Sequence, residues 1–206
     1  MKMVRLLAAL CLVGLVLGLA APLSQAQAPR RTIVVVDFGD RVGGWSSTRE
    51  VVTTRVISKL RDDQVLRVLP RDRVREALQA AKVETVGFID WEEAQKVAKS
   101  LEADYVIMGE VTAFDQQHQG GCLPIVGCAY TITAAVTLRG KVLNVATGQF
   151  VGEPKAEVKK QQSSVSIWVG PWWGSISVDN FDGQLIGKVT LEAVDKFITE
   201  AKPQLK

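Results

Sequence analysis

Two long segments of alternating apolar residues constrain the fold of this chain more than any other feature. Over residues 130–145 the alternation places five side chains on one face of a strand: Tyr130, Ile132, Ala134, Val136 and Leu138. Residues 103–115 predict a second long strand, and the glycine-rich residues 116–127 predict a connection between the two. The apolar residues change face after Gly140, which indicates a β-bulge at that glycine. The pattern predicts antiparallel hairpins in the second half of the chain.

The rest of the chain alternates strands with amphipathic helices. Short apolar runs predict strands over 32–38, 64–69 and 149–160, the first of them buried on both faces. Helical spacing and capping residues predict four helices, which begin at Ser47, Pro70, Asp90 and Asp179. The helix that begins at Asp90 is expected to bury Trp91, Ala94 and Val97. This order predicts an α+β (layered α/β) fold: a mixed central sheet with helices packed against it, plus one or two extended β-hairpin insertions.

Residues 1–26 are predicted to be a signal peptide. Lys2 and Arg5 give a positive start, a long apolar run follows, and small residues precede a cleavage site after Ala26. An uncleaved membrane anchor is the alternative, because an apolar run of about 18 residues is near the lower limit for spanning a bilayer. The mature chain, residues 27–206, is therefore expected to be a single exported domain.

The composition argues against several classes of function. The chain has 25 basic and 22 acidic residues, and because Lys2 and Arg5 belong to the leader, the mature part is almost neutral. Bulk charge therefore gives no support for nucleic-acid binding. His118 is the only histidine, and neither a nucleophile motif nor a phosphate-binding glycine motif occurs, so we expect neither an enzyme nor a cofactor. Four arginines between residues 67 and 75 favour a solvated helix face, with an acidic partner surface as the alternative.

Two cysteines remain once the leader, which contains Cys11, is removed. Cys122 and Cys128 lie close together in sequence, and a disulfide is the simplest state for an even pair in an exported protein. Two free thiols and a metal site are the alternatives. A metal site would need two further ligands, and the chain offers a single histidine, so we expect no metal.

Residues 163–178 form the most unusual segment. Its two arms alternate as strands do, and Trp168, Trp172 and Trp173 fall within six residues of one another. Adjacent residues of a strand point to opposite faces, so Trp172 and Trp173 cannot both face one core. Indole rings favour the membrane–water interface, and exposed aromatic hairpins also occur at subunit contacts. We expect these three tryptophans to contact lipid or an adjacent subunit, with an ordinary loop folded back on its own sheet as the alternative.

The order of these segments resembles a known family. A VVVDF strand precedes a glycine-rich loop, ADYVIMGEV occupies residues 103–111, and VLNVATG occupies residues 142–148. With these pieces the chain is similar to the CsgG family of curli-secretion components, whose wider relatives share a TolB-like periplasmic fold. The resemblance covers most of residues 32–200.

The resemblance implies a non-enzymatic export channel of the outer membrane. Subunits would form a homo-oligomeric ring, and each would lend two β-hairpins, near residues 113–136 and 151–180, to a shared barrel. The loop after the first strand, with Gly43, Gly44 and Trp45, would form the constriction. The expected partner is an exported protein or another envelope component, in the periplasm or at the periplasmic face of, or within, the outer membrane. The alternative is a soluble periplasmic interaction module with the TolB-like fold, such as a regulator of cell-wall synthesis.

Overall fold

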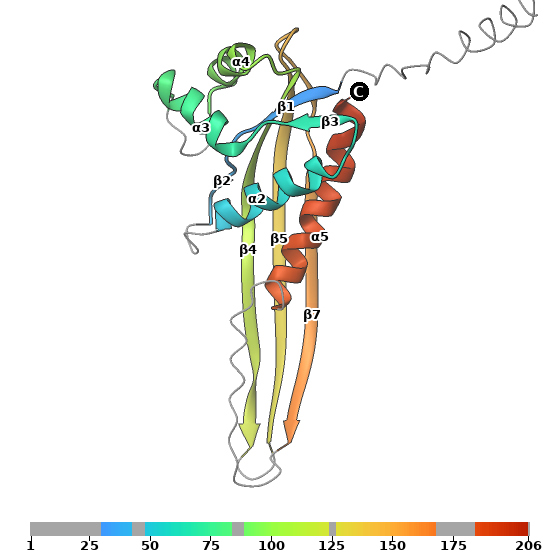
Figure 1. The fold of residues 1–206 in the computed structure, drawn as a ribbon. Helices are drawn as coiled ribbons and strands as arrows, with labels where there is room; N and C mark the ends of the chain where they lie inside the picture. Colours follow the sequence, from blue (N-terminus) through green and yellow to red (C-terminus); the bar gives the residue numbers. More distant parts are fainter. Residues whose placement is uncertain (1–29, 43–47, 84–88, 124–126, 168–183, 206) are drawn as a thin grey trace, which may run out of the picture.

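The computed structural model describes residues 30–42, 48–83, 89–123, 127–167 and 184–205 (Figure 1). The strands are β1 (Arg31–Val35), β2 (Gly39–Asp40), β3 (Leu66–Val68), β4 (Tyr105–Leu123), β5 (Gly127–Asn144), β6 (Gln149–Gly152) and β7 (Lys155–Ile167). The helices are α2 (Thr48–Arg61), α3 (Arg71–Ala80), α4 (Trp91–Ser100) and α5 (Leu185–Ala201), followed by the 3-10 turn η2 (Lys202–Leu205). The predicted α+β class, a mixed sheet with helices packed against it, is confirmed.

The described strands form one seven-stranded sheet with the order β3-β1-β4-β5-β6. β1 pairs in parallel with both β3 and β4, as expected for a strand buried on both faces. β4 pairs antiparallel with β5 from Tyr105↔Asn144 to Leu123↔Gly127. β5 pairs with β6 at its C-terminal end and with β7 along the rest of its length. β2 adds a short parallel pair to β4.

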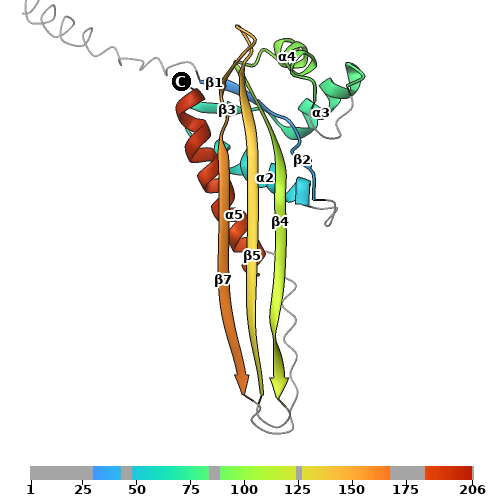
Figure 2. The ribbon, with the colours of Figure 1, turned by 180° about the vertical axis from the view of Figure 1, so that it is seen from behind.

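The helices cover the two faces of the sheet and enclose two cores. α2 and α5 pack on one face, here called the α5 face, together with Ile33 and Val35 of β1. α3 and α4 pack on the other, the α4 face, together with Val34 of β1. In Figure 1 α5 lies in front of β5 and β7, and in Figure 2 the strands lie in front of α5. Consecutive residues of β1 thus enter opposite cores, which explains the continuous apolar run in the sequence.

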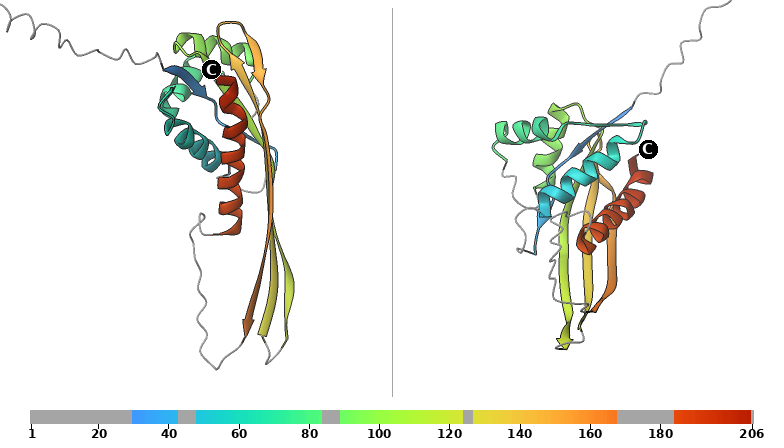
Figure 3. Two further views of the ribbon diagram at one scale, coloured as in Figure 1. Left: turned by 90° about the vertical axis from the view of Figure 1, so that its right-hand side faces the viewer. Right: turned by 60° about the horizontal axis from the view of Figure 1, so that its bottom comes forward.

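Residues 116–123 do not form part of the loop that the sequence predicts over 116–127. β4 continues to Leu123, and every residue from Ala113 to Leu123 is paired with β5. Together with β7, these strands extend past the N-terminal end of α5 (Figure 3). Glycine and glutamine are poor strand formers, but pairing with β5 satisfies their backbone groups, and this tertiary effect outweighs propensity. We call residues 115–123, 127–135 and 159–167 the β-arm.

The β-bulge predicted at Gly140 is also wrong. Gly140 pairs in register with Gly109, and the register shifts lie elsewhere in β4 and where β5 meets β6. The apolar residues of β5 change face because both faces are covered at this end: Leu138 belongs to the α5 core and Leu143 to the α4 core. A Cβ on Gly140 would lie 2.5 Å from the Phe197 ring, so glycine lets α5 approach the sheet.

Three groups of expectations lie outside the described residues: the signal peptide over 1–26, the loop residues Gly43, Gly44 and Trp45, and the tryptophans Trp168, Trp172 and Trp173. The first expected hairpin, 113–136, falls within the β4–β5 pair. The second, 151–180, is described as far as Ile167 in β7. Among the described residues, no helix combines the length and the apolar content that crossing a membrane requires.

Candidate functional site

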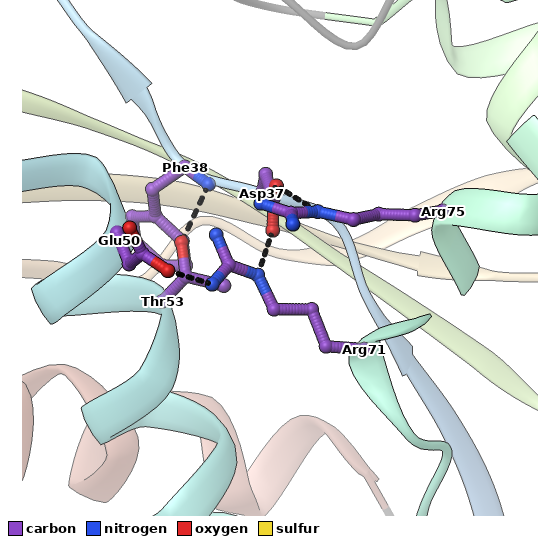
Figure 4. A network of polar contacts seen from close by, with 6 residues as sticks. All are labelled: Asp37, Phe38, Glu50, Thr53, Arg71 and Arg75. Carbon is purple, nitrogen blue, oxygen red and sulfur yellow. Dashed lines mark hydrogen bonds and ion pairs between the residues drawn. The ribbon is translucent and has the colours of Figure 1, made fainter. Parts of the chain in front are cut away.

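A polar network fastens the end of β1 to two helices (Figure 4). Asp37 follows β1 and accepts hydrogen bonds from two arginines of α3. Arg71 Nε lies 2.7 Å from Asp37 Oδ1, while Arg75 Nε and Nη2 lie 2.9 and 2.8 Å from Oδ2. Arg71 Nη1 also lies 3.3 Å from Glu50 Oε1 of α2. Two arginines four residues apart share one helix face, so both can meet the same carboxylate. We call these four residues the Asp37 network.

The central carboxylate of the Asp37 network is ionised at neutral pH. Burial of the Asp37 carboxyl disfavours its charged form, but the hydrogen bonds and charges of Arg71 and Arg75 outweigh burial and hold its pKa below the ordinary value. Burial also acts against the charge of Arg71, and the contact with Asp37 outweighs it, so the pKa of this guanidinium is raised. The prediction of a solvated arginine face therefore needs correction: Arg71 and Arg75 are tied to Asp37, while Arg67 and Arg73 are exposed.

Phe38 anchors the same corner in the α5 core. Its N–H donates to Thr53 Oγ1 of α2 at 3.0 Å (Figure 4). Its ring packs edge-on against Phe197 of α5, with 5.5 Å between the centroids. The ring also fills the space above Gly109, where any Cβ would overlap it. The end of β1 is therefore fixed by charge on one side and by packing on the other.

The loop expected to form a constriction begins and ends on this fixed corner. Before the loop, the Arg41 N–H donates to the Val111 carbonyl oxygen at 3.2 Å. Arg41 Nε lies 2.6 Å from Oε2 of the buried Glu110, with the geometry of an ion pair rather than of a hydrogen bond. After the loop, the buried Thr48 begins α2. Residues 43–47 themselves lie outside the described part of the chain, so the constriction stays a prediction.

The β-arm is polar on both faces along most of its length. On the α4 face its register aligns three rows: Asp115, Ala135 and Lys159, then Gln117, Thr133 and Gln161, then Gln119, Thr131 and Ser163. On the α5 face one row holds His118, Ile132 and Gln162, and Tyr130 follows in the next. The middle of the β-arm thus presents mainly amide and hydroxyl groups, whereas contact with lipid would require an apolar face.

A disulfide crosses the far end of the β-arm. Cys122 and Cys128 are register partners of β4 and β5, and their sulfur atoms are bonded. The Tyr130 hydroxyl lies 2.7 Å from Cys122 Sγ. His118 Nε2 lies 2.9 Å from Gln116 Nε2. Within the described ranges, no cluster of three His, Cys, Asp or Glu residues is suited to hold a metal ion.

Sequence reasoning missed two features. The first is the Asp37 network. Its residues are visible in the sequence as an aspartate at the end of a buried strand and as two arginines four residues apart on a helix. Nothing in the sequence shows that the aspartate and the arginines meet. The second feature is an aromatic pair at the surface. Trp91 was predicted to lie on the buried side of its helix, but its side chain is exposed. Its ring contacts the exposed ring of Phe150, with 6.4 Å between the centroids.

The fold and this geometry define an α+β protein with a projecting β-arm as its most prominent part. The family model described as "Curli production assembly/transport component CsgG" matches residues 20–205, and the chain belongs to the CsgG family. This confirms the resemblance found in the sequence. Membership indicates an envelope-associated protein that is not an enzyme.

Solved structures share the fold at low sequence identity. The hypothetical protein CT253 from Chlamydia trachomatis is 11% identical, with a TM-score of 0.51 and coverage of 85% of this chain and 98% of that one. Lipoprotein GNA1162 from Neisseria meningitidis is 13% identical, with a TM-score of 0.51 and coverage of 82% and 99%. A PelC dodecamer from Paraburkholderia phytofirmans has a TM-score of 0.46 at 13% identity, with coverage of 87% and 91%. A comparison with curated protein sequences gives no match.

Proposed function

We propose that this protein is an assembly or export component of the cell envelope that works as a homo-oligomeric ring, of the outer-membrane export-channel type. The observation that carries the proposal is the β-arm, three long strands that extend past the helices (Figure 3). From Ala113 onward, β4 pairs only with β5 among the described residues, and β7 likewise pairs only with β5. Long strand edges are templates for pairing with another chain. We therefore expect the arms of neighbouring subunits to lie side by side.

The Asp37 network supports this proposal because it gives the loop over 43–47 a rigid base. β1, α2 and α3 are joined by Asp37, Glu50 and Arg71, and β2 is held on β4 by the Arg41 contact with Glu110. A constriction formed by one loop from each subunit requires that each loop start from the same fixed position. In the proposed ring these loops would face the exported protein.

A soluble periplasmic interaction module is the second candidate, and the polarity of the β-arm favours it. The rows that begin with Gln117 and Gln119 carry amide and hydroxyl groups on the α4 face, and His118 and Gln162 flank Ile132 on the α5 face. Strands that contact lipid have one apolar face over about 9–11 residues. Such an arm suits a ring or a partner surface in water.

Fractionation combined with a mass measurement separates the two candidates. The full chain is expressed with its own leader in a Gram-negative host. Its amount is then measured both in the osmotic-shock fluid and in the outer-membrane pellet. The proposal expects the protein in the outer-membrane pellet, and a single mass of several subunits by mass photometry after detergent extraction. A monomer released by osmotic shock would contradict the proposal and support the soluble module.

A further inference from the structure

Three of the exposed large apolar side chains of the described residues belong to α4 and β6, and two of them are in contact. Trp91, at the start of α4, is 41% exposed, and Phe150 and Val151 of β6 are 40% and 36% exposed. Lys141 Nζ lies 4.9 Å from the centroid of the Phe150 ring. In the described part of the chain β6 pairs only with β5, so its other backbone edge is open. We call Trp91 and Phe150, whose rings are in contact, the aromatic knob, because clustered exposed apolar side chains mark contact surfaces.

At the opposite end of the strand order, β3 borders an apolar groove of about 590 Å³. Val65, directly before β3, is 62% exposed and lines the groove together with Leu66, Pro203 and Leu205. We call it the β3 groove. A groove of this size and lining is suited to aromatic side chains.

The positions of knob and groove suit a contact that repeats from copy to copy. They lie at the two ends of the order β3-β1-β4-β5-β6, so they are different surfaces of one subunit. A contact between two different surfaces generates a ring when the rotation closes. β3 and β6 also run in the same direction, because β3, β1 and β4 are parallel and β5 is antiparallel to both β4 and β6. Neighbouring copies in a ring keep one axial direction, so these two edges would meet in parallel.

The surroundings of the knob are acidic. Asp90, Glu92 and Glu93 are exposed at the start of α4, on either side of Trp91. The ammonium of Lys141, which lies above the Phe150 ring, is 4.0 Å from Glu153. The exposed charged side chains next to Trp91 in the sequence are therefore acidic.

The lining of the groove contains two basic side chains, Arg31 and Lys202, and one acidic side chain, Asp63. Arg61 at the end of α2 and Arg67 in β3 are both exposed, and Asp62 is the exposed acid beside them. Each of the two lining cations has an acidic neighbour: Arg31 lies 3.6 Å from Asp104, and Lys202 lies 2.9 Å from Asp63. The lining has one more basic than acidic side chain, and two exposed arginines lie next to it in the sequence, so this side has the opposite sign to the knob, as required of two surfaces that meet.

We propose that the aromatic knob of one copy packs into the β3 groove of the next copy and forms a subunit contact of the ring. This inference rests on the proposed ring and names the surfaces that build it. Trp91 and Phe150 are the anchors, since buried aromatic side chains dominate interface energetics. Glu92 and Glu93 would face Arg61 and Arg67 of the neighbour and set the orientation of the contact.

The first test removes the anchors. Trp91→Ser/Phe150→Ser is compared with the wild-type full chain by mass photometry over a dilution series, with circular dichroism as the check on folding. The double variant should remain folded but be monomeric at concentrations where the wild type is a ring. Val42→Ser, which replaces another exposed apolar side chain outside the knob and groove, should assemble as the wild type does. Assembly of the double variant at wild-type concentrations would overturn the inference.

The second test reverses the charges and then restores their match. Glu92→Lys/Glu93→Lys alters only the knob side, and Arg61→Glu/Arg67→Glu alters only the groove side. Each variant alone should fail to assemble, because like charges then meet at every contact. A mixture of the two should form rings, since each contact in an alternating ring joins opposite charges. A mixture that stays monomeric would overturn the knob-and-groove contact, as would rings formed by either variant alone. A wild-type monomer in the same measurement would instead overturn the proposed function.

Discussion

The charge of Asp37 joins the end of β1 to α3. Its carboxylate accepts hydrogen bonds from Arg71 and Arg75 and so connects β1 to α3. We predict that Asp37→Asn lowers the free energy of unfolding at pH 7 by about 2 kcal/mol, because hydrogen bonds to charged groups are lost and two arginines lose their counter-charge. Urea unfolding followed by circular dichroism measures this, and Asp72→Asn, on the exposed side of α3, is the matched control.

The same residue should give the stability a defined pH dependence. The pKa of Asp37 in the folded protein lies below its ordinary value of 3.8. A carboxyl group of this kind stabilises the fold above its unfolded pKa, and the stabilisation is lost as the pH falls through the folded pKa. The difference in unfolding free energy between wild type and Asp37→Asn should thus be constant above about pH 5 and shrink below about pH 4. A difference that persists undiminished at pH 2 would show that the pair is not an ionic lock.

Substitution by alanine should destabilise the protein at one glycine of the sheet and have almost no effect at another. A Cβ on Gly140 would lie 2.5 Å from the Phe197 ring and 2.8 Å from the Met108 carbonyl oxygen, while a Cβ on Gly121 meets nothing within 4 Å. Gly140→Ala should therefore destabilise by about 1–3 kcal/mol, as overpacked cores do. Gly121→Ala should leave the melting temperature within about 2 °C of the wild type. Equal melting temperatures for the two variants would contradict the close approach of α5 to β5.

At the scale of elements, the disulfide should act on the β-arm alone. Closing a loop of about seven residues contributes about 2 kcal/mol in the chain-entropy model, and this loop joins the ends of β4 and β5. We predict that the mature protein, unfolded without reductant, shows no reactive thiol on maleimide labelling. Reduction should speed amide hydrogen exchange near Cys122 and Cys128 and leave exchange in β1 unchanged. Two labelled thiols per chain would remove the disulfide.

Elements with a strong period could be predicted from the sequence, and those set by tertiary pairing could not. The alternation after Tyr130 located β5, and the apolar run around Val34 located β1 as an inner strand buried on both faces. Residues 116–123 carry no such period, and they are strand only because β5 lies beside them. The change of face after Gly140 was correctly noticed and wrongly explained, since one sequence cannot show that a second helical layer covers the other face.

At the scale of the molecule, the candidate site depends on contacts that no local pattern contains. Asp37 lies 34 and 38 residues from the two arginines that bind it, and the knob joins Trp91 of α4 to Phe150 of β6, far along the chain. Family membership was predictable because it rests on segments in order, 103–111 and 142–148 among them. A surface that faces another copy of the chain can be recognised only by which of its side chains are exposed and by their charge. Exposure is known only once the folded structure is known, so the sequence could not predict such a surface.

The division of the molecule into a body and a β-arm leads to a last prediction. Neither core contains a residue from 117–133, so the body should fold without that part of the arm. We consider a variant in which residues 117–133 are replaced by an Asn-Gly turn that joins Gln116 to Ala134, which are register partners. Its cooperative melting should survive within about 5 °C of the wild type, because the loss is confined to exposed pairing.

Val34→Asp serves as the unfolded control for the trimmed variant. It buries an unpaired charge at the centre of the sheet, and we expect it to abolish the cooperative transition. If the knob-and-groove contact builds the ring, the trimmed protein should also retain the wild-type number of subunits, since the aromatic knob and the β3 groove both lie in the body. A trimmed protein that unfolds as Val34→Asp does would show that the β-arm belongs to the folding unit. A folded but monomeric one would assign the decisive subunit contact to the arm instead.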